Sequence, residues 1–234
     1  MTRRHYEVAM SVEALASAWA RTDNAPDGAI VVADSEISGR LRGGTPWRTK
    51  GDDALMMAMV IRPALDPLQE ALLWLVASIG VADALAEVTG NDHPIIWPDT
   101  VMRGSETEGD TAAVRSLINV TVQLGPGRID HGVLAVRTHL DGLGATKDQL
   151  LGSLEQHLLA ATRMAEGDSL ALLEAFNDRC SVMNRRALVS LLPRGEARGR
   201  VTAVDKDGFL VLESSTGMLE RIAPASLRAL ELVD

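Results

Sequence analysis

The apolar segments of this 234-residue chain change in kind at about residue 184. Before that point, short apolar runs typical of strands alternate with longer segments that have helical spacing. After it, only short strand-like runs remain, and Asp207-Gly208 between two of them indicates a hairpin. The pattern predicts an α+β domain over residues 1–184 and a small all-β barrel over residues 185–234.

The helix with the clearest terminal signals begins at Asp66, a candidate N-cap that is followed by Pro67 at the first helical position. Gln69 is placed to complete a capping box, and Gly90 marks the end. The expected buried face comprises Leu68, Leu72, Leu75, Val76 and Ile79. We expect strands at 28–33, 54–61, 95–97, 114–124 and 131–140, and further helices at 12–20, 146–166 and 169–180.

These helices also carry start signals. Ser11 is a candidate N-cap of the first, Thr146 with Gln149 makes a capping box for the second, and Asp168 begins the third. The first helix is expected to place one apolar stripe toward the core, made of Val12, Leu15, Ala16 and Trp19.

Charge and hydropathy exclude several classes of function. A net charge of −9 argues against a nucleic-acid-binding surface spread over the molecule and against attraction to an anionic membrane. The longest apolar run, Ala71–Ala82, is too short to span a bilayer. Cys180 is the single cysteine, so no intramolecular disulfide can form, and the histidines show no metal-ligand spacing. We therefore expect a soluble, cytoplasmic protein.

A basic, glycine-rich segment, residues 37–51, lies between the predicted strands 28–33 and 54–61 and contains no acidic residue. Glycine permits positive φ and close approach of the backbone to a ligand, and arginine guanidinium groups suit carboxylate or phosphate oxygens. Two interpretations remain open, a cradle for an adenylate or similar anion and a solvated hairpin loop. The segment contains Gly39, Arg40, Arg42, Gly43, Gly44, Arg48 and Lys50.

Three segments of the chain resemble the biotin protein ligase family. ADSEISGRLRGGTPW (33–47) is similar to the family's adenylate-binding loop, which runs Gly-Arg-Gly-Arg-x-Gly-Arg-x-Trp after an alanine and a Gln-Thr pair. IIWPDT (95–100) is similar to its Lys-Trp-Pro-Asn-Asp segment. GRVTAVDKDGFLVLESSTGMLERIAPASLR (199–228) follows the pattern of its terminal barrel, and the order of elements agrees from Ser11 to the C-terminus.

The resemblance implies a fold and a two-step reaction. The fold is a catalytic domain of the class II aminoacyl-tRNA synthetase and biotin protein ligase type, followed by an SH3-like β-barrel. Biotin and ATP, with Mg²⁺ in an active enzyme, form biotinyl-adenylate, and the acyl group passes to a lysine of a biotin-carrier domain. The winged helix of repressor-type members has no counterpart in these residues, so no DNA-binding role is implied. A homodimer through a sheet edge is common in the family.

The resemblance also implies the site residues. Asp99 stands near the family's aspartate, and Arg115 or Ser116 stands where the catalytic lysine is expected. The candidate catalytic residues are therefore Asp99 and Arg115. The candidate adenylate- or ligand-binding residues are Ser11, Glu36, Gly39, Arg40, Arg42, Gly43, Gly44, Trp47, Trp97 and Arg137.

The departures from the family pattern fall on the chemistry. The chain has only three lysines among 23 basic residues, Lys50, Lys147 and Lys206, and none lies between Trp97 and Asp141. Glu36 and Ile37 stand where the biotin pocket has Gln and Thr. Loss of one preorganised donor to a developing charge typically costs about 10²–10³ in rate. We therefore expect a degenerate ligase that retains a pocket for an adenylate or acyl ligand. The alternatives are an active ligase for biotin or another acyl group, and a purely structural role.

Overall fold

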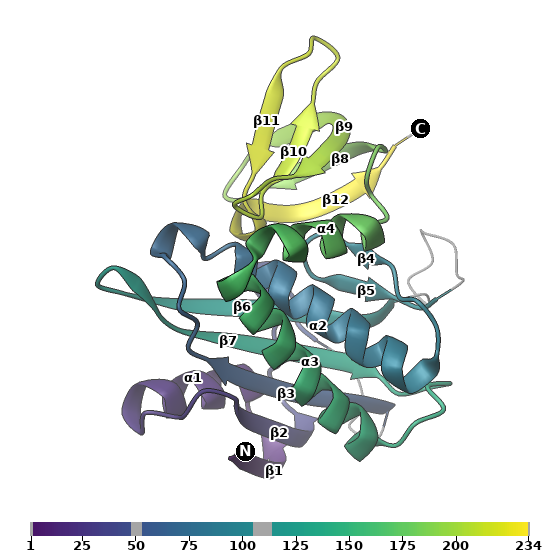
Figure 1. Cartoon of the computed structure of the whole chain (residues 1–234). Helices are drawn as coiled ribbons and strands as arrows, with labels where there is room; N and C mark the ends of the chain where they lie inside the picture. The colour runs from purple at the N-terminus through teal and green to yellow at the C-terminus, as the bar shows by residue number, and fades with distance from the viewer. Residues whose placement is uncertain (1, 48–52, 105–113, 234) are drawn as a thin grey trace.

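The computed structural model describes residues 2–47, 53–104 and 114–233. These residues form a seven-stranded mixed sheet with helices on both faces, followed by a five-stranded sheet (Figure 1). The helices are α1 (Val12–Thr22), η1 (Arg42–Gly44), η3 (Pro67–Gln69), α2 (Leu72–Thr89), α3 (Lys147–Gly167), α4 (Ser169–Arg179) and η5 (Pro224–Ser226). The strands are β1 (Arg3–Ala9), β2 (Ala29–Glu36), β3 (Ala54–Ile61), β4 (Ile95–Ile96), β5 (Thr100–Met102), β6 (Val114–Gly125), β7 (Arg128–His139), β8 (Arg186–Leu191), β9 (Glu196–Val204), β10 (Leu210–Glu213), β11 (Leu219–Ile222) and β12 (Leu227–Leu232).

The larger sheet has the order β1-β2-β3-β7-β6-β5-β4. Only β1 and β2 pair in parallel, and every other neighbouring pair is antiparallel. The sequence does not predict β1, because most of its residues are polar and exposed at the sheet edge. The predicted α+β class with a mixed sheet is confirmed.

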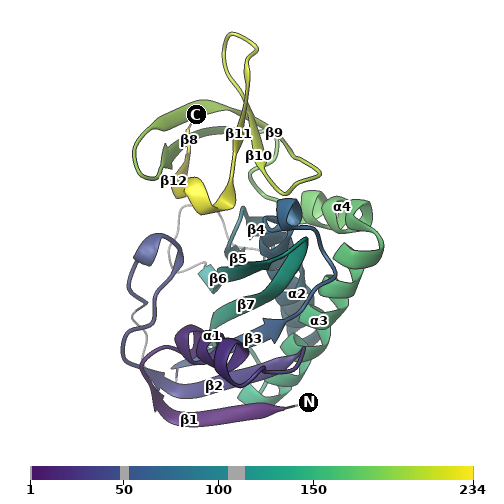
Figure 2. The same ribbon diagram turned by 90° about the vertical axis from the view of Figure 1, so that its left-hand side faces the viewer.

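Helix α1 covers one face of this sheet, and α2 and α3 cover the other (Figure 2). Ser11 caps α1 as predicted, and its Oγ accepts from Ala14 N at 3.3 Å. Of the predicted stripe, Val12, Ala16 and Trp19 are buried against β2 and β3, and Leu15 is partly buried beside them. This packing directs the first turn of α1 toward the end of β2, where the basic loop begins.

The predicted helix from Asp66 to Gly90 is interrupted near its start. Asp66 and Gln69 form the expected capping box, but on the 3-10 turn η3, and α2 begins only at Leu72. Leu68 is 84% exposed, so its place in a buried face was wrong. The single-face expectation was also wrong, because α2 is buried on most sides between the sheet, α3 and α4.

Helix α2 also bears on the membrane question. At 18 residues it is long and apolar enough to cross a membrane, so the 12-residue run in the sequence understated its length. However, 72% of the helix is buried inside the protein, which is typical of a core helix.

The second sheet has the order β11-β10-β9-β8-β12, with all neighbours antiparallel, and begins two residues after the predicted boundary. β11 and β12 lie at its two edges, so the hydrogen bonds form an open sheet and the predicted barrel closure is not confirmed. Its apolar side chains, including Val189 and Leu227, belong to the same buried cluster as those of α2.

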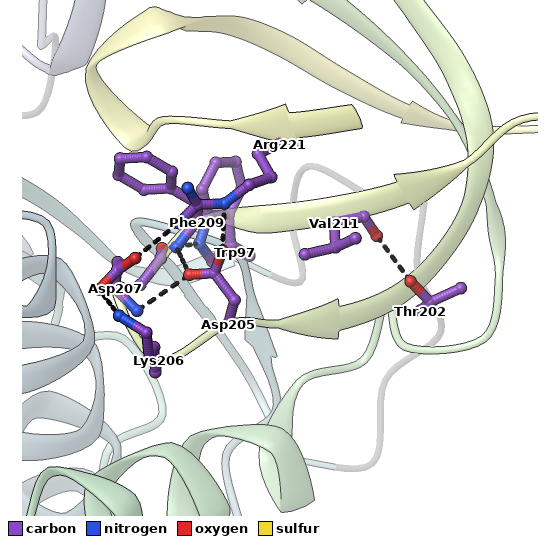
Figure 3. Close-up of polar contacts among 9 residues, drawn as sticks. Trp97, Thr202, Asp205, Lys206, Asp207, Phe209, Val211 and Arg221 are labelled. Carbon is purple, nitrogen blue, oxygen red and sulfur yellow. Dashed lines mark hydrogen bonds and ion pairs between the residues drawn. The ribbon is translucent and has the colours of Figure 1, made fainter. Parts of the chain in front are cut away.

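One turn of the second sheet docks directly onto the first part of the chain (Figure 3). Trp97 Nε1 donates to Gly208 O at 3.3 Å, and the indole is 1% exposed. Gly208 has φ +84°, and a Cβ atom there would lie 3.0 Å from the Ala71 carbonyl, before α2. The turn is stiffened by Asp205, which accepts from Phe209 N at 3.1 Å, and by Arg221, which pairs with Asp205 at 2.6 Å.

Candidate functional site

The described part of the basic loop folds into a small hairpin. Trp47 N donates to Gly39 O at 2.9 Å, and Arg40 Nη1 donates to Gly44 O at 3.0 Å. Gly43 and Gly44 have φ of +67° and +79°, which glycine adopts at no steric cost. The predicted loop residues Arg48 and Lys50 lie outside the described residues.

Glu36, at the end of β2, forms a buried ion pair with Arg137 of β7. Arg137 Nε and Nη2 donate to the two carboxylate oxygens at 2.8 and 2.9 Å, and both side chains are fully buried. The same carboxylate accepts from Val12 N, in the first turn of α1, at 2.9 Å. The pair therefore joins β2, β7 and the N-terminus of α1 at the base of the loop.

The base of the loop packs closely against this pair. A Cβ atom at Gly39 would overlap the Glu36 carboxylate and lie 3.3 Å from Arg137 Nε, so a larger residue there would displace the carboxylate from its pair. The remaining terminal nitrogen of Arg137, Nη1, is buried and has no hydrogen-bond partner among the described residues. A buried donor without an acceptor costs about 1–3 kcal/mol, and a ligand oxygen would remove that cost.

A second ion pair ties the loop to the other side of the site. Arg42 Nε donates to Asp99 Oδ2 at 2.6 Å, and Arg42 Nη1 donates to the Leu227 carbonyl of the second sheet. Burial raises the pKa of Asp99 above its usual value, although the Arg42 charge acts in the opposite direction. Arg42 thus connects the loop to Asp99 and to the second sheet together.

Arg115 and Ser116 were the two candidates for the position of the family's lysine, and their side chains have different partners. Arg115 is buried and donates to His139 O at 2.7 Å and Asp141 O at 2.8 Å. Ser116 Oγ lies 2.8 Å from Thr138 Oγ1 and is fully buried. The pairing of β6 with β5 shifts register between Val114 and Ser116, so Arg115 lies at an irregularity of the strand.

The structure brings some predicted residues together and separates others. Ser11, Glu36, Gly39 and Arg137 meet at the start of α1 and the base of the loop, as the contacts above describe. Trp47 closes the loop and packs its ring 5.1 Å from that of His139. Trp97 lies at the junction with the second sheet, bonded to Gly208.

The two described lysines are both engaged away from the loop. Lys147 Nζ contacts Asp34 at 3.2 Å, and Lys206 Nζ contacts Asp207 at 2.8 Å. The basic charge at the site within the described residues therefore comes from arginines.

One contact at the site has no signal in the sequence. Glu13, in the first turn of α1, accepts from Asn119 Nδ2 at 2.9 Å and from the Thr121 hydroxyl. These partners lie more than a hundred positions apart, and only the packing of α1 on β6 brings them together. The described residues contain no group of three or more His, Cys, Asp or Glu side chains placed to hold a metal ion.

The curated proteins to which the chain is similar in sequence include two bifunctional ligase/repressor proteins. The chain is 27% identical over 221 residues to the bifunctional ligase/repressor BirA of Bacillus subtilis, which covers 84% of this chain and 65% of that protein. BirA of Bacillus spizizenii is 26% identical over the same span. The chain thus spans about 65% of the length of these curated relatives. No family model matches the chain.

Solved structures share the fold at low sequence identity. The biotin protein ligase of Aquifex aeolicus, in complex with biotin and ATP, superposes with a TM-score of 0.77 at 16% identity and covers 99% of both chains. A biotin protein ligase-like protein of unknown function from Silicibacter superposes with a TM-score of 0.71 at 18% identity, over 96% of this chain and 95% of that one.

Proposed function

Because the chain is a biotin protein ligase-like protein, we propose that it is a degenerate ligase, which still binds an acyl or adenylate-type ligand at the base of the basic loop. The ligand site comprises Glu36, Gly39, Arg40 and Arg137. The main support is that Arg137 is fully buried and one of its terminal nitrogens has no acceptor among the described residues. A ligand oxygen at this nitrogen would complete the site.

The engagement of the other cations supports the degenerate interpretation. Glu36 neutralises Arg137, Asp99 neutralises Arg42, and Arg115 donates to backbone carbonyls. Stabilisation of a developing negative charge requires preorganised donors that are free to meet it. We assign Asp99 and Arg115 to the positions of the ligase's catalytic residues, with Asp99 acting here as the anchor for Arg42.

Active ligation is the second candidate, and the relatives named as ligases favour it. In that case ATP and biotin, as bound in the Aquifex structure, would be the substrates, and a biotin-carrier domain would receive the acyl group. Arg40 supports this alternative, because it is exposed and hydrogen-bonds only to a loop carbonyl in the described part of the chain. Exchange of labelled pyrophosphate into ATP, dependent on biotin, lipoate or octanoate, tests it. Exchange above background supports ligation, and its absence with all three acids removes this candidate.

Thermal unfolding in the presence of ligands tests the binding proposal. Biotin, octanoate, ATP and a non-hydrolysable biotinyl-adenylate analogue are each titrated against the full chain. A ligand at a hundred times its Kd should stabilise the fold by about 2.7 kcal/mol. Arg40→Gln should weaken the response, whereas Arg228→Gln, an exposed arginine of β12, should not. No response to any of these compounds would refute the proposal.

The proposal extends to the domain assignment, the oligomeric state and the cellular location of the protein. We assign residues 1–184 to a domain of the class II synthetase and ligase type, and residues 185–234 to the counterpart of the SH3-like barrel. The unpaired outer edge of β1 offers a surface for a homodimer. A buried single cysteine and the burial of α2 are compatible with a cytoplasmic protein that interacts with neither membranes nor nucleic acid.

A further inference from the structure

The outer face of the second sheet carries a groove of about 450 Å³ whose lining includes three arginines. Arg186 comes from β8, and Arg198 and Arg200 come from β9. The alternate residues of the two strands, such as Ala187 and Val201, are buried in the core, so the three arginines share the opposite face. The groove is remote in sequence from the basic loop.

The three arginines occupy neighbouring positions on the sheet, and little negative charge faces them. Arg186 and Arg200 are direct partners across β8 and β9, and Arg198 is two positions along the same face. Like charges directly opposite each other destabilise a sheet. Within the described residues, Arg186 and Arg198 have no hydrogen bond or ion pair through their side chains, and Arg200 donates to Asn184 O at 2.7 Å.

One carboxylate shares the groove without cancelling this charge. Glu213 lies opposite Arg200 across β10, and no ion pair joins it to any of the three arginines in the described structure. The three arginines and the one glutamate of the lining together give the groove a net charge of +2. Residues 185–234 contain eight basic and seven acidic residues, whereas the whole chain contains 23 and 32. The net charge of this segment is therefore slightly positive, whereas that of the preceding residues is negative, which favours long-range attraction of an anion to this sheet.

The backbone around the groove limits what can bind there. Both edges of β9 are already paired, with β8 and with β10, so a peptide cannot join the sheet as an added strand at this point. Recognition must come from side chains. Guanidinium groups bind phosphate oxygens through paired hydrogen bonds, and the Ser214 and Ser215 hydroxyls, also in the lining, can donate as well.

We propose that this groove is a second ligand site, which binds the oligophosphate group of a small molecule. Three guanidinium groups offer more paired donors than the oxygens of a single phosphate can accept, which favours a chain of two or more phosphates. The site is independent of the proposed ligand site at the basic loop.

Calorimetric titration of the full chain with inorganic tripolyphosphate, in a low-salt buffer without phosphate, tests the proposal. We expect one molecule to bind per chain, with an affinity that falls as salt is added. Arg186→Gln and Arg198→Gln should each raise the Kd about tenfold or more, because each removes a charge-assisted contact. Both residues are exposed, so the variants should fold. Arg228→Gln makes the same change in charge on the same sheet, outside the groove, and should leave the Kd unchanged.

Competition distinguishes the sources of the phosphate. The competition uses the Arg40→Gln variant, in which the basic loop is altered. Displacement of tripolyphosphate by ATP supports a nucleotide as the ligand. Failure of ATP to compete supports a free oligophosphate. Absence of tripolyphosphate binding, an equal loss with Arg228→Gln, or tighter binding of hexaglutamate would overturn the proposal.

Unfolding of the ligand-free protein gives an independent test. Arg186→Gln should raise the urea midpoint at low salt, because it relieves the repulsion from Arg200. A lower midpoint would mean that Arg186 has a structural role, and would overturn the proposal.

Discussion

Replacement of Glu36 by glutamine removes one charge from the buried pair while it preserves the shape of the side chain. In the native structure Glu36 accepts two hydrogen bonds from Arg137 and one from Val12 N. The variant leaves Arg137 as a fully buried cation with no counter-ion within the described residues. Removal of one partner of a buried ion pair typically destabilises a protein by about 3–5 kcal/mol.

Urea unfolding followed by tryptophan fluorescence measures this loss, because the chain has four tryptophans. For a chain of this size the loss corresponds to a fall of about 6–20 °C in Tm. Glu13→Gln provides a matched control, since Glu13 is the neighbour of Val12 in the first turn of α1 and accepts hydrogen bonds from uncharged Asn119 and Thr121. We expect the control to cost about 1 kcal/mol.

A double variant separates the charge effect from lost packing. Glu36→Leu combined with Arg137→Met replaces the pair by apolar side chains, and such replacements are often neutral or stabilising. The double variant should therefore be more stable than Glu36→Gln. A cost below 1 kcal/mol for Glu36→Gln, or a double variant as unstable as the sum of its two single variants, would refute this reasoning.

Three further predictions concern other sites. Gly39→Ala should lower the urea midpoint, because its Cβ would overlap Glu36. Gly152→Ala, in open space on α3, should instead raise stability by about 0.5–1 kcal/mol. Equal effects of the two substitutions would contradict the close packing at Gly39. Burial raises the pKa of Cys180 to about 11, so iodoacetamide should label the native thiol slowly at pH 8 and rapidly in urea, and fast native labelling would show that the thiol is accessible. Burial lowers the pKa of His93, so the unfolded state binds more protons, and the free energy of unfolding should fall as the pH drops below about 6.5. His93→Gln should reduce this dependence of stability on pH. An unchanged dependence in the variant would exclude His93 as its source.

Local signals in the sequence were reliable where neighbouring residues decide the structure. Ser11, Thr146 and Asp168 were predicted to begin helices, and each accepts a hydrogen bond from its own first turn. The strand at 54–61 has the predicted bounds. The error at Leu68 arose because the capping box at Asp66 and Gln69 is satisfied by a 3-10 turn as well as by an α-helix.

The candidate site residues were found individually, but their partners were not. Glu36 and Arg137 were both predicted as site residues, and nothing in the sequence paired them. The same holds for Arg42 and Asp99. The arginines of the groove on the second sheet were missed, because their common face depends on the register of β8 and β9.

The sequence by itself determined the change near residue 184 from mixed helices and strands to mostly strands, the helix caps and the glycine-rich loop, because hydrogen bonds and dihedral preferences within a few residues govern these features. Only the tertiary structure decided which charges meet. Glu36 and Arg137 are 101 positions apart, and Arg42 and Asp99 are 57 apart. The sheet order, which places β7 two strands from β2, and the packing of the second sheet beside the loop bring these side chains within hydrogen-bond distance.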